Sequence, residues 1–418
     1  MKVLLAFPRP LVPADTGGKI RSLEIFSRLA KRMEIHAMSF ADPEQDAKGI
    51  EAMQQMFASY TPVEWRESPK YSASYYFDVI ANQFRSLPYS ISKYCVPRFA
   101  ETASTISQRR GCDLLFCDFL TMATALRNIP LRPRVLFQHN VEAQLRKRQW
   151  EVETAPVKKI IFQNEWKRTR RVESEVCKCF EYVIAVSDQD RELFEREYGV
   201  KNVSVIPTGV DCDFFRPASG QVRKGRIVFV GSMDWYPNED GIGWFLREVY
   251  PKVRAGNPAA SFAIVGRKPS PSLTAIAASD SSITLTGRVE DVRPYLAEAE
   301  VVVVPLRVGG GTRIKIPEAM AMSKVVVSTR IGAEGLPFED RKEIVLEDDA
   351  SRFADAILQV LKAPSRRAEI ESAARRIVQE NYDWNSVTDR MEEILVSVET
   401  GKEYRAINSA AARLATSG

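Results

Sequence analysis

Short runs of consecutive apolar residues alternate along the chain with stretches whose apolar positions recur at helical spacing. The run MKVLLAF, residues 1–7, stops at a proline, and the run EIHAMSF, residues 34–40, follows after one such stretch. Between them, two glycines open a segment in which Ile20, Leu23 and Phe26 recur every third residue. A continuously apolar strand is typical of a parallel sheet buried on both faces. The pattern therefore predicts a strand, a glycine loop, a helix and a strand, the first unit of a doubly wound sheet.

Two series of such strands follow, separated by a stretch rich in proline, serine, glycine and charge. The first series adds residues 113–118, 134–140, 182–187 and 203–209, and the second comprises residues 226–232, 262–266, 283–287, 301–306, 325–329 and 343–348. We therefore expect an α/β protein with two tandem doubly wound, Rossmann-like domains. The expected parts are an N-terminal domain over residues 1–209, a linker over 210–225, a C-terminal domain over 226–381, and a final segment over 382–418 with an amphipathic helix and a loose tail.

The composition is that of an ordinary soluble protein with more than one domain. The chain has 418 residues, of which 45% are hydrophobic and 27% charged. Its net charge of +5 is mild, and we expect no nucleic-acid partner. No signal peptide or membrane-spanning run is visible, and the six cysteines form no paired C-x-x-C units. These features favour free thiols and a cytoplasmic location.

Basic residues gather in the first half of the chain, at residues 146–150, 158–159 and 166–171. Such clusters can meet an anionic membrane surface or an acidic substrate, and they can also be solvated helix faces. Residues 71–99 mix aromatic residues with lysine and arginine. They either rest on a membrane and receive a lipid-linked acceptor, or form a helical lid over the acceptor. At most a peripheral contact with the inner face of the membrane is expected.

The segment PLRVGGGTRIKIPEAMAM, residues 305–322, joins three glycines, an arginine and a lysine to the start of a predicted helix. Glycines let a backbone approach a ligand closely, and a helix N-terminus favours an anion. Pro317 supports a helix start, because proline is well tolerated in the first turn. The pattern favours a phosphate site, with an ordinary strand-to-helix turn as the alternative. It is not a P-loop, because G-x-x-x-x-G-K-[ST] is absent.

Five segments, in order, carry a resemblance to a known enzyme family. They are FQHNVEAQLRKR, SVIPTGVDCDFFRP, FVGSMDWYPNEDGIGWF, LTGRVEDVRPYLAEAEVVVVPL and GGGTRIKIPEAMAMSKVVVSTRIGAEG. With them the chain resembles, over nearly its whole length, the retaining GT-B fold glycosyltransferases of group 1, or family 4, in a branch that makes bacterial exopolysaccharide or cell-surface glycans. The resemblance implies transfer of a sugar from a UDP- or GDP-sugar to a glycan, lipid-linked or small-molecule acceptor. It also implies no metal or other cofactor, and a C-terminal helix that crosses back to the N-terminal domain.

The resemblance assigns roles to particular residues. Charge grows on the leaving diphosphate as the glycosidic bond breaks, and cations aimed there lower the barrier. We expect Arg313 and Lys315 to be catalytic in this way, and His139 to act near the reacting centre. Glu318 is expected to accept hydrogen bonds from the donor's ribose hydroxyls. The other expected donor contacts are Gly18, Ser232, Asn238, Arg267, Arg288, Val289, Gly310, Gly311, Thr312 and Glu334, and the expected acceptor contacts are Gly17, Arg21, Asn140 and Glu142.

The sequence also departs from the family. Many members carry a further glutamate, in contact with the donor sugar, where this chain has Gly310. The family's arginine and lysine after the first C-terminal strand are replaced by GSMDWYPN. A nucleotide-sugar epimerase on the same fold, or a degenerate protein that serves a glycan-assembly complex, are the alternatives. The D-x-D triplet at residues 211–213 lies in the interdomain connection, and the chain has two histidines, so we expect no metal site.

Overall fold

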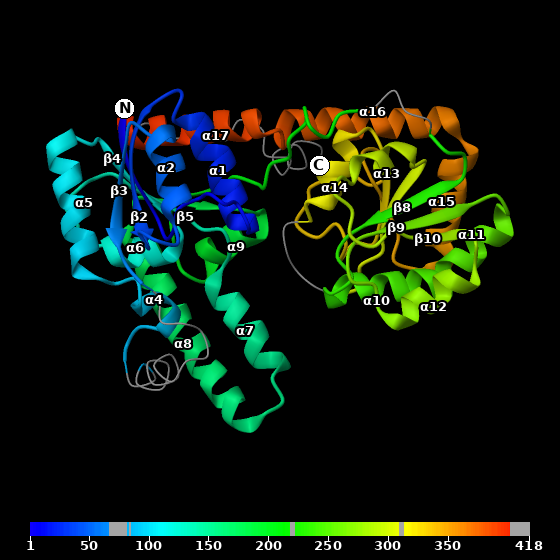
Figure 1. Ribbon diagram of the computed structural model, residues 1–418, viewed down its shortest axis with the longest axis horizontal. Helices are drawn as coiled ribbons and strands as arrows, with labels where there is room; N and C mark the ends of the chain where they lie inside the picture. Colours follow the sequence, from blue (N-terminus) through cyan, green and yellow to red (C-terminus); the bar gives the residue numbers. More distant parts are fainter. Residues whose placement is uncertain (67–81, 83–84, 218–221, 309–312, 402–418) are drawn as a thin grey trace. The chain divides into compact units, whose positions relative to one another are not determined.

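The computed structural model of the protein describes residues 1–66, 82, 85–217, 222–308 and 313–401. The chain divides into two compact units. The first unit consists of Met1–Pro207 together with the last helix from Thr388 onward, and the second unit consists of Thr208–Val387. In Figure 1 each unit is a central sheet with helices around it.

The first unit contains a seven-stranded sheet with the order β3-β2-β1-β4-β5-β6-β7. All neighbouring strands are parallel. The strands are β1 (Lys2–Phe7), β2 (Glu34–Ala41), β3 (Ser59–Glu64), β4 (Leu114–Asp118), β5 (Arg134–Phe137), β6 (Tyr182–Ala185) and β7 (Val203–Val205). The described helices are α1 (Gly17–Leu29), α2 (Ala47–Met56), α4 (Tyr89–Ser92), α5 (Pro97–Arg110), α6 (Leu120–Leu126), α7 (Glu142–Val152), α8 (Pro156–Cys179) and α9 (Asp188–Arg196).

Helices cover both faces of this sheet. On one face Leu4 of β1 packs in a single core with Phe99 of α5 and Val176 of α8. On the other face Phe26 of α1 meets Phe116 of β4 edge to face, with ring centroids 5.2 Å apart. Successive residues of a strand point to opposite faces, so a strand covered on both sides is apolar throughout. This requirement is the reason why apolar runs mark the strands in the sequence.

The second unit contains a six-stranded parallel sheet with the order β10-β9-β8-β11-β12-β13. The strands are β8 (Arg226–Val230), β9 (Ser261–Val265), β10 (Ile283–Leu285), β11 (Val301–Val304), β12 (Val325–Ser328) and β13 (Val345–Leu346). The helices are α10 (Tyr236–Trp244), the π-helix η1 (Phe245–Val249), α11 (Tyr250–Gly256), α12 (Pro271–Ser279), α13 (Arg293–Glu298), α14 (Lys315–Ala321), α15 (Ala350–Lys362), α16 (Pro364–Asn381) and α17 (Trp384–Thr400), whose last residues belong to the first unit.

The four valines of β11 show how one strand serves two cores. Val301 and Val303 pack in one core, which also contains side chains of α10, η1, α11 and α15. Val302 and Val304 pack in the other, with side chains of α13, α14 and α16. All four side chains are almost completely buried. The predicted α/β class, with two tandem doubly wound units, is confirmed.

In both sheets the strand order reverses beside the first strand of the unit. β1 lies between β2 and β4, and β8 lies between β9 and β11. In open parallel sheets, ligands bind outside the carboxyl ends of the strands at such a reversal. The loops that follow β1, β4, β8 and β11 therefore occupy the positions where a site is expected.

Two stretches differ from the sequence-based expectation. Strand β3 was not predicted, because it is an edge strand with alternating burial and a proline, Pro62, rather than an apolar run. Val210 and Asp211, the first residues of the predicted linker, fall in the second unit. There the backbone N–H of Val210 donates to the carbonyl of Tyr382 at 2.7 Å.

Helix α17 belongs to both units. Its first residue, Trp384, packs against Gly209, where a Cβ atom would lie 2.3 Å from the indole ring, so a larger residue there would collide. Its residues from Thr388 onward belong to the first unit. There Arg32, just after α1, forms ion pairs with Asp389 at 2.5 Å and with Glu392 at 2.9 Å.

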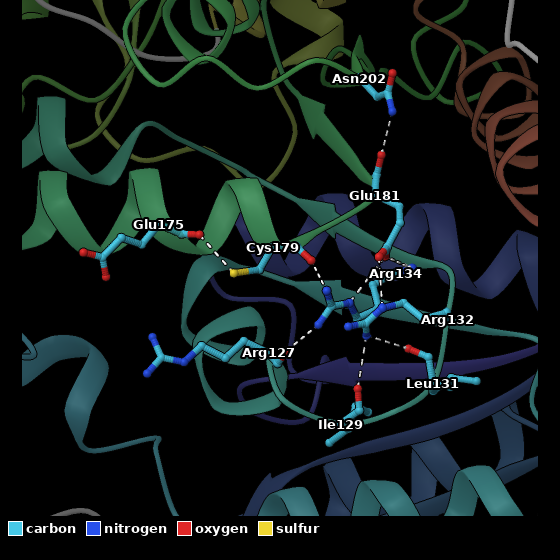
Figure 2. A network of polar contacts seen from close by, with 9 residues as sticks. All are labelled: Arg127, Ile129, Leu131, Arg132, Arg134, Glu175, Cys179, Glu181 and Asn202. Atoms are coloured by element: carbon cyan, nitrogen blue, oxygen red, sulfur yellow. Dashed lines mark hydrogen bonds and ion pairs between the residues drawn. The ribbon is translucent and has the colours of Figure 1, made fainter.

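A buried arginine joins the amino ends of three strands in the first unit (Figure 2). The guanidinium of Arg134, at the start of β5, donates to the carbonyls of Arg127 and Cys179 and to Glu181 Oε2. Glu181 Oε2 also accepts from the backbone N–H of Arg134 at 2.8 Å, and the carbonyl of Glu181 accepts from Asn202 at 3.0 Å. This network lies at the opposite edge of the sheet from the loops described above, so its role is structural.

Replacing Arg134 by alanine is expected to lower the free energy of unfolding by about 3 kcal/mol, because it removes the buried guanidinium that donates to the carbonyl groups of Arg127 and Cys179. Chemical denaturation measures this loss. Arg98→Ala, on the exposed side of α5, is the matched control. A loss of less than about 1 kcal/mol, the ordinary effect of a surface substitution, would contradict the structural role.

Candidate active site

Three loops lie side by side at the carboxyl edge of the second sheet. The N–H of Gly231, after β8, donates to the carbonyl of Val265 at 2.9 Å, and Gly266, after β9, bridges to Gly287, after β10. A Cβ atom on Gly266 would lie 1.8 Å from the carbonyl oxygen of Gly231. Only glycine therefore permits these loops to approach so closely.

The predicted donor contacts on these loops come together in part. Ser232 Oγ accepts from Arg267 Nε at 2.8 Å and donates to Asp234 Oδ1 at 2.5 Å. Arg267 also lies 3.6 Å from Asp234, so Asp234 already neutralises part of its charge. Arg288 is exposed on the neighbouring loop, and Val289 packs against the core beneath it. Ser232 and Arg267 thus form a cluster, whereas Arg288 stands apart from it.

Lys315, the first residue of α14, follows β11 and reaches across the strand reversal to the loop after β8. Its Nζ donates to Asn238 Oδ1 at 2.8 Å, and Asn238 Nδ2 donates to the carbonyl of Ser232 at 2.7 Å. The same Nζ lies 4.5 Å from the ring centroid of Phe229, a favourable position for a cation. A Cβ atom on Gly231 would lie 2.8 Å from both Lys315 Nζ and Asn238 Nδ2, so glycine makes room for this contact.

Burial shifts the pKa values of Lys315 and Glu318 so that the neutral form of each is favoured. Burial, together with the charge of Arg313, lowers the pKa of Lys315 to about 7. Burial raises the pKa of Glu318 to about 7, although the charge of Lys315 opposes this. The Glu318 carboxylate has no hydrogen-bond partner within the described ranges of the chain. One helical turn therefore carries a cation and a carboxylate whose charges a suitable ligand would stabilise.

Arg313 is buried next to this turn. Its side chain is 3% exposed, and its NH2 lies 3.3 Å from Glu334 Oε2. Its backbone adopts a left-handed φ of 48°, which is uncommon for a residue with a side chain and marks a constrained turn. The structure therefore brings the predicted Arg313 and Glu334 together. The predicted contacts of Gly310, Gly311 and Thr312 lie outside the described residues and stay predictions.

The first unit has a polar cluster of its own at the carboxyl edge of its sheet, called the first cluster below. Asp118, the last residue of β4, is fully buried, and its Oδ1 lies 2.5 Å from His139 Nε2. Asp118 Oδ2 accepts from Ser22 Oγ of α1 at 2.6 Å. Arg21, on the same helix, places NH1 at 3.1 Å from His139 Nδ1. The predicted Arg21 and His139 are thus in contact, around a carboxylate.

The contacts of His139 define its protonation. An arginine can only donate, so Nδ1 of His139 accepts, and the proton of the neutral ring lies on Nε2 and is donated to Asp118. Burial lowers the pKa of His139 below its ordinary value, and Arg21 adds to this effect, whereas Asp118 opposes it. Burial also lowers the pKa of Arg21, to about 10, which leaves it charged at neutral pH. Both ring nitrogens are occupied, so His139 orients Arg21 and Asp118.

Aromatic packing fixes the same histidine. The ring of Phe119 stacks on His139 with centroids 4.0 Å apart and an interplanar angle of 10°. A Cβ atom on Gly18 would lie 2.8 Å from the Phe119 ring, so glycine lets α1 approach this stack. A Cβ atom on Gly17 would meet nothing within 4 Å. The structure therefore gives a packing reason for the predicted Gly18 and none for Gly17.

The remaining predicted acceptor contacts, Asn140 and Glu142, lie where β5 leads into α7. Asn140 is exposed. Glu173 of α8 accepts from the backbone N–H groups of Glu142 at 2.8 Å and Ala143 at 3.0 Å, and from the hydroxyl of Tyr198 at 2.9 Å. Burial raises the pKa of Glu173 to about 7, although these hydrogen bonds lower it. Glu173 thus serves as a buried cap that holds the first turn of α7.

Sequence reasoning missed three members of the first cluster. Asp118 ends a predicted strand, and a carboxylate at the end of an apolar strand is a signal that could have identified it. Ser22 reads as an ordinary helix residue, and Phe119 reads as a core residue. Nothing in the one-dimensional pattern distinguishes these two from their neighbours.

No group of three His, Cys, Asp or Glu side chains in the described residues is placed to hold a metal ion. In the D-x-D triplet, Asp211 Oδ1 accepts from the backbone N–H groups of Asp213 at 3.0 Å and Phe214 at 2.8 Å. This carboxylate therefore closes a turn. None of the helices in the described part has the length and apolar character to cross a bilayer.

Comparison with known proteins adds the family. The model for Glycosyltransferase Family 4 matches residues 53–214, and the model for Glycosyl transferases group 1 matches residues 224–363. The chain belongs to this family of glycosyltransferases. It is 24% identical to an uncharacterized 44.6 kDa protein in the cps region of Klebsiella pneumoniae. The 291 aligned residues cover 68% of this chain and 74% of the relative.

Two further comparisons concern proteins with named ligands. The chain is 26% identical, over 46% of its length and 55% of the relative's, to the GDP-mannose-dependent monoacylated alpha-(1-6)-phosphatidylinositol monomannoside mannosyltransferase of Corynebacterium glutamicum. The structure of Anabaena HepE in complex with UDP matches with a TM-score of 0.65 at 14% identity, over 95% of this chain and 100% of that one. This likeness shows the GT-B fold. With the two family matches, the chain is a GT-B glycosyltransferase that uses a nucleotide-sugar donor.

His139 is expected to keep its proton on Nε2 and to titrate below the ordinary range of a histidine, because burial disfavours the charged ring. Nitrogen-15 NMR of the imidazole rings measures both properties. The chain has two histidines, so a His36→Gln variant assigns the signals. Asp118→Asn removes the group that favours the protonated ring, so the midpoint of the titration should fall further. A proton on Nδ1, or a titration midpoint above the ordinary value of a histidine, would contradict the hydrogen-bond assignment.

Proposed function

We propose that the protein transfers a sugar from a UDP- or GDP-sugar to a hydroxyl of a glycan acceptor, retains the anomeric configuration, and needs no metal ion. HepE, a structural neighbour, was solved with UDP and with UDP-glucose, and the Corynebacterium relative is named for its use of GDP-mannose. Because these proteins use different nucleotides, the proposal covers both. The Klebsiella relative in a cps region supports a role in polysaccharide biosynthesis.

The pair formed by Lys315 and Glu318 carries the proposal. The two residues begin α14 at the strand reversal of the second sheet, and both have a pKa of about 7 because they are buried. A nucleotide sugar offers a diphosphate anion and, nearby, two vicinal ribose hydroxyls. The diphosphate would hold the proton on Lys315, and the hydroxyls would donate to the ionised Glu318. Such a ligand supplies an anion for Lys315, whose hydrogen-bond partner Asn238 is neutral, and donors for Glu318.

The same arrangement accounts for the missing family residues. Where family members carry an arginine and a lysine after the first strand of this domain, the chain has the stretch GSMDWYPN, in which Ser232 and Asn238 can add neutral hydrogen bonds. Asn238 binds Lys315 at 2.8 Å, so the lysine of α14 fills the space next to that loop. Arg313, held by Glu334, adds a second cation two residues away. We propose that these two cations stabilise the charge of the leaving diphosphate.

The first cluster bears on the stereochemical outcome. An inverting transfer needs a general base within reach of the acceptor hydroxyl. His139 has both ring nitrogens engaged, by Arg21 and by Asp118, and so is a poor base. This supports retention. In the proposal His139 and Asp118 position Arg21, and Arg21 binds the ligand.

We place the reaction in the cytoplasm, near the membrane. All six cysteines are free thiols, which fits a reducing compartment. Ile160 of α8 is 68% exposed beside the exposed Lys158 and Lys159, a combination suited to peripheral contact with an anionic membrane. Of the predicted membrane or lid segment, residues 71–99, the stretches 71–81 and 83–84 lie outside the described residues.

Lys315→Ala is expected to reduce turnover at saturating donor roughly 100-fold, because losing one contact to a developing charge raises the barrier by about 3 kcal/mol. Initial rates of donor consumption, with and without acceptor glycans, measure the loss. Lys362→Ala, on an exposed position of α15, is the matched control, and thermal unfolding shows whether the fold persists. Near-normal turnover in Lys315→Ala would remove this lysine from the mechanism.

The affinity for a nucleotide sugar is expected to peak near pH 7. Above its pKa of about 7, Lys315 must take up a proton to bind the diphosphate, so affinity falls as the pH rises, by up to about tenfold per unit. Below the pKa of about 7, Glu318 is protonated and accepts hydroxyls less well, so affinity also falls. Calorimetric titration should lose the alkaline limb in Lys315→Arg and the acidic limb in Glu318→Gln. A flat profile in the unmodified protein would rule out this pair as the donor contact.

Activity is expected to persist after removal of divalent cations, because the proposed cations that face the diphosphate are Arg313 and Lys315. Rates after dialysis against EDTA are compared with rates after adding Mg²⁺ or Mn²⁺. Complete loss in EDTA that either ion restores would overturn the metal-free proposal.

A further inference from the structure

A groove runs along the hairpin of α7 and α8 in the first unit. It consists of a cavity of about 440 Å³ and a neighbouring cavity of about 240 Å³, which share Trp166, Arg170, Glu197 and Tyr198 as walls. Helices α7 and α8 lie side by side here (Figure 1). None of the predicted site residues lines the groove.

Rigid aromatic walls shape this groove. Trp166 stacks on Trp150, with ring centroids 5.0 Å apart and an interplanar angle of 9°. The hydroxyl of Tyr198 donates to the buried Glu173 at 2.9 Å, which fixes that ring. Tyr198 is 2% exposed and supports the wall from beneath, whereas the half-buried Trp166 offers a flat apolar surface held in one orientation at little cost in entropy. Such a surface fits the C–H face of a sugar ring, whose hydroxyls point to the sides.

The charge of the groove is positive. Among the described residues that line the two cavities, Lys147, Lys167, Arg170 and Arg171 are cations, and Glu197 is the one carboxylate. Arg170 lies 3.4 Å from Glu197, but both side chains are about half exposed, so this pair neutralises little. Lys167 is exposed and forms no ion pair with any described residue. Arginine and lysine side chains around the aromatic walls favour a ligand with an anionic group.

We propose that this groove binds the acceptor, and that the acceptor is an acidic saccharide, with its sugar ring on Trp166 and its carboxylate or phosphate at Lys167 and Arg170. The inference rests on the proposed glycosyl transfer, because it names the class of acceptor. Ala143 and Gln144, in the first turn of α7, line the smaller cavity, and α7 begins three residues after His139. The groove therefore starts beside the strand-end cluster. A saccharide held in it extends from Trp166 toward Arg21 and His139.

Direct binding in the absence of donor tests the proposal. The acidic probe is a tetrasaccharide of alternating glucuronic acid and N-acetylglucosamine, and the matched neutral probe is the same tetrasaccharide with its carboxyl groups reduced to alcohols. The acidic probe is expected to bind about tenfold more tightly than the neutral one. Equal affinity for the two probes, or no binding of either at millimolar concentration, would overturn the proposal.

Substitutions distinguish the contribution of the cations to binding from that of the aromatic walls. Lys167→Gln combined with Arg170→Gln should lower the affinity for the acidic probe about tenfold and leave the affinity for the neutral probe unchanged. Trp166→Ala should weaken both probes, and Trp166→Phe, which keeps an aromatic ring, should restore most of the loss. Lys178→Gln, exposed on the same helix outside the groove, is the matched control and should bind like the unmodified protein. Unchanged binding in the Lys167/Arg170 variant would remove these cations from the site.

A second probe distinguishes the two sources of the anion. A glucosyl diphosphate with a short isoprenyl chain presents a phosphate in place of a carboxylate. Of the two acidic probes, the one that binds more tightly shows whether the natural acceptor carries a carboxylate or a phosphate. Donor hydrolysis without acceptor tests the proposed transfer separately. Hydrolysis without binding of any acidic probe would refute the groove alone, whereas binding without turnover of any donor would support the groove and refute the proposed transfer.

Discussion

Both sheets are covered by helices on their two faces, which confines polar chemistry to the ends of the strands. The four valines of β11 are divided between two cores, so no side chain of that strand is left to meet a ligand. The strand ends, and the loops and helix starts that follow them, supply the functional groups, and the two strand-order reversals decide which of these meet. Glycines such as Gly231 and Gly266 then set how closely these loops approach. The geometry of both clusters follows from this arrangement.

The two clusters differ in how far their charges are compensated. In the first unit Asp118, His139, Arg21 and Ser22 satisfy one another, which gives a rigid and largely neutralised group. In the second unit Lys315 has a neutral partner, Asn238, and Glu318 has none within the described residues. The two charges favour each other, but burial outweighs this attraction and shifts the pKa of both toward the neutral form. The second cluster is therefore the one that gains most from an anionic ligand, and the first is suited to positioning.

The sequence was sufficient for the fold and for part of the site. Apolar runs marked the strands because both faces of each sheet are buried. Strand β3 was not predicted, because an edge strand needs no such run. Lys315, Glu318 and Arg313 were predictable because they lie close together on one loop and one helical turn. Asp118 had a signal as a carboxylate at a strand end, but its contacts with His139 and Ser22 form only when strands and a helix distant in sequence become neighbours. The groove at Trp166 depends in the same way on the packing of three helices.

The central claim is that the start of α14 holds the diphosphate and ribose of the donor. A crystal structure of the protein with a bound UDP-sugar or GDP-sugar tests it most directly. The account predicts a phosphate oxygen within hydrogen-bond distance of Lys315 Nζ, and the ribose hydroxyls on the carboxylate of Glu318. A nucleotide bound elsewhere, with Lys315 still on Asn238 and Glu318 without a ligand, would contradict the account.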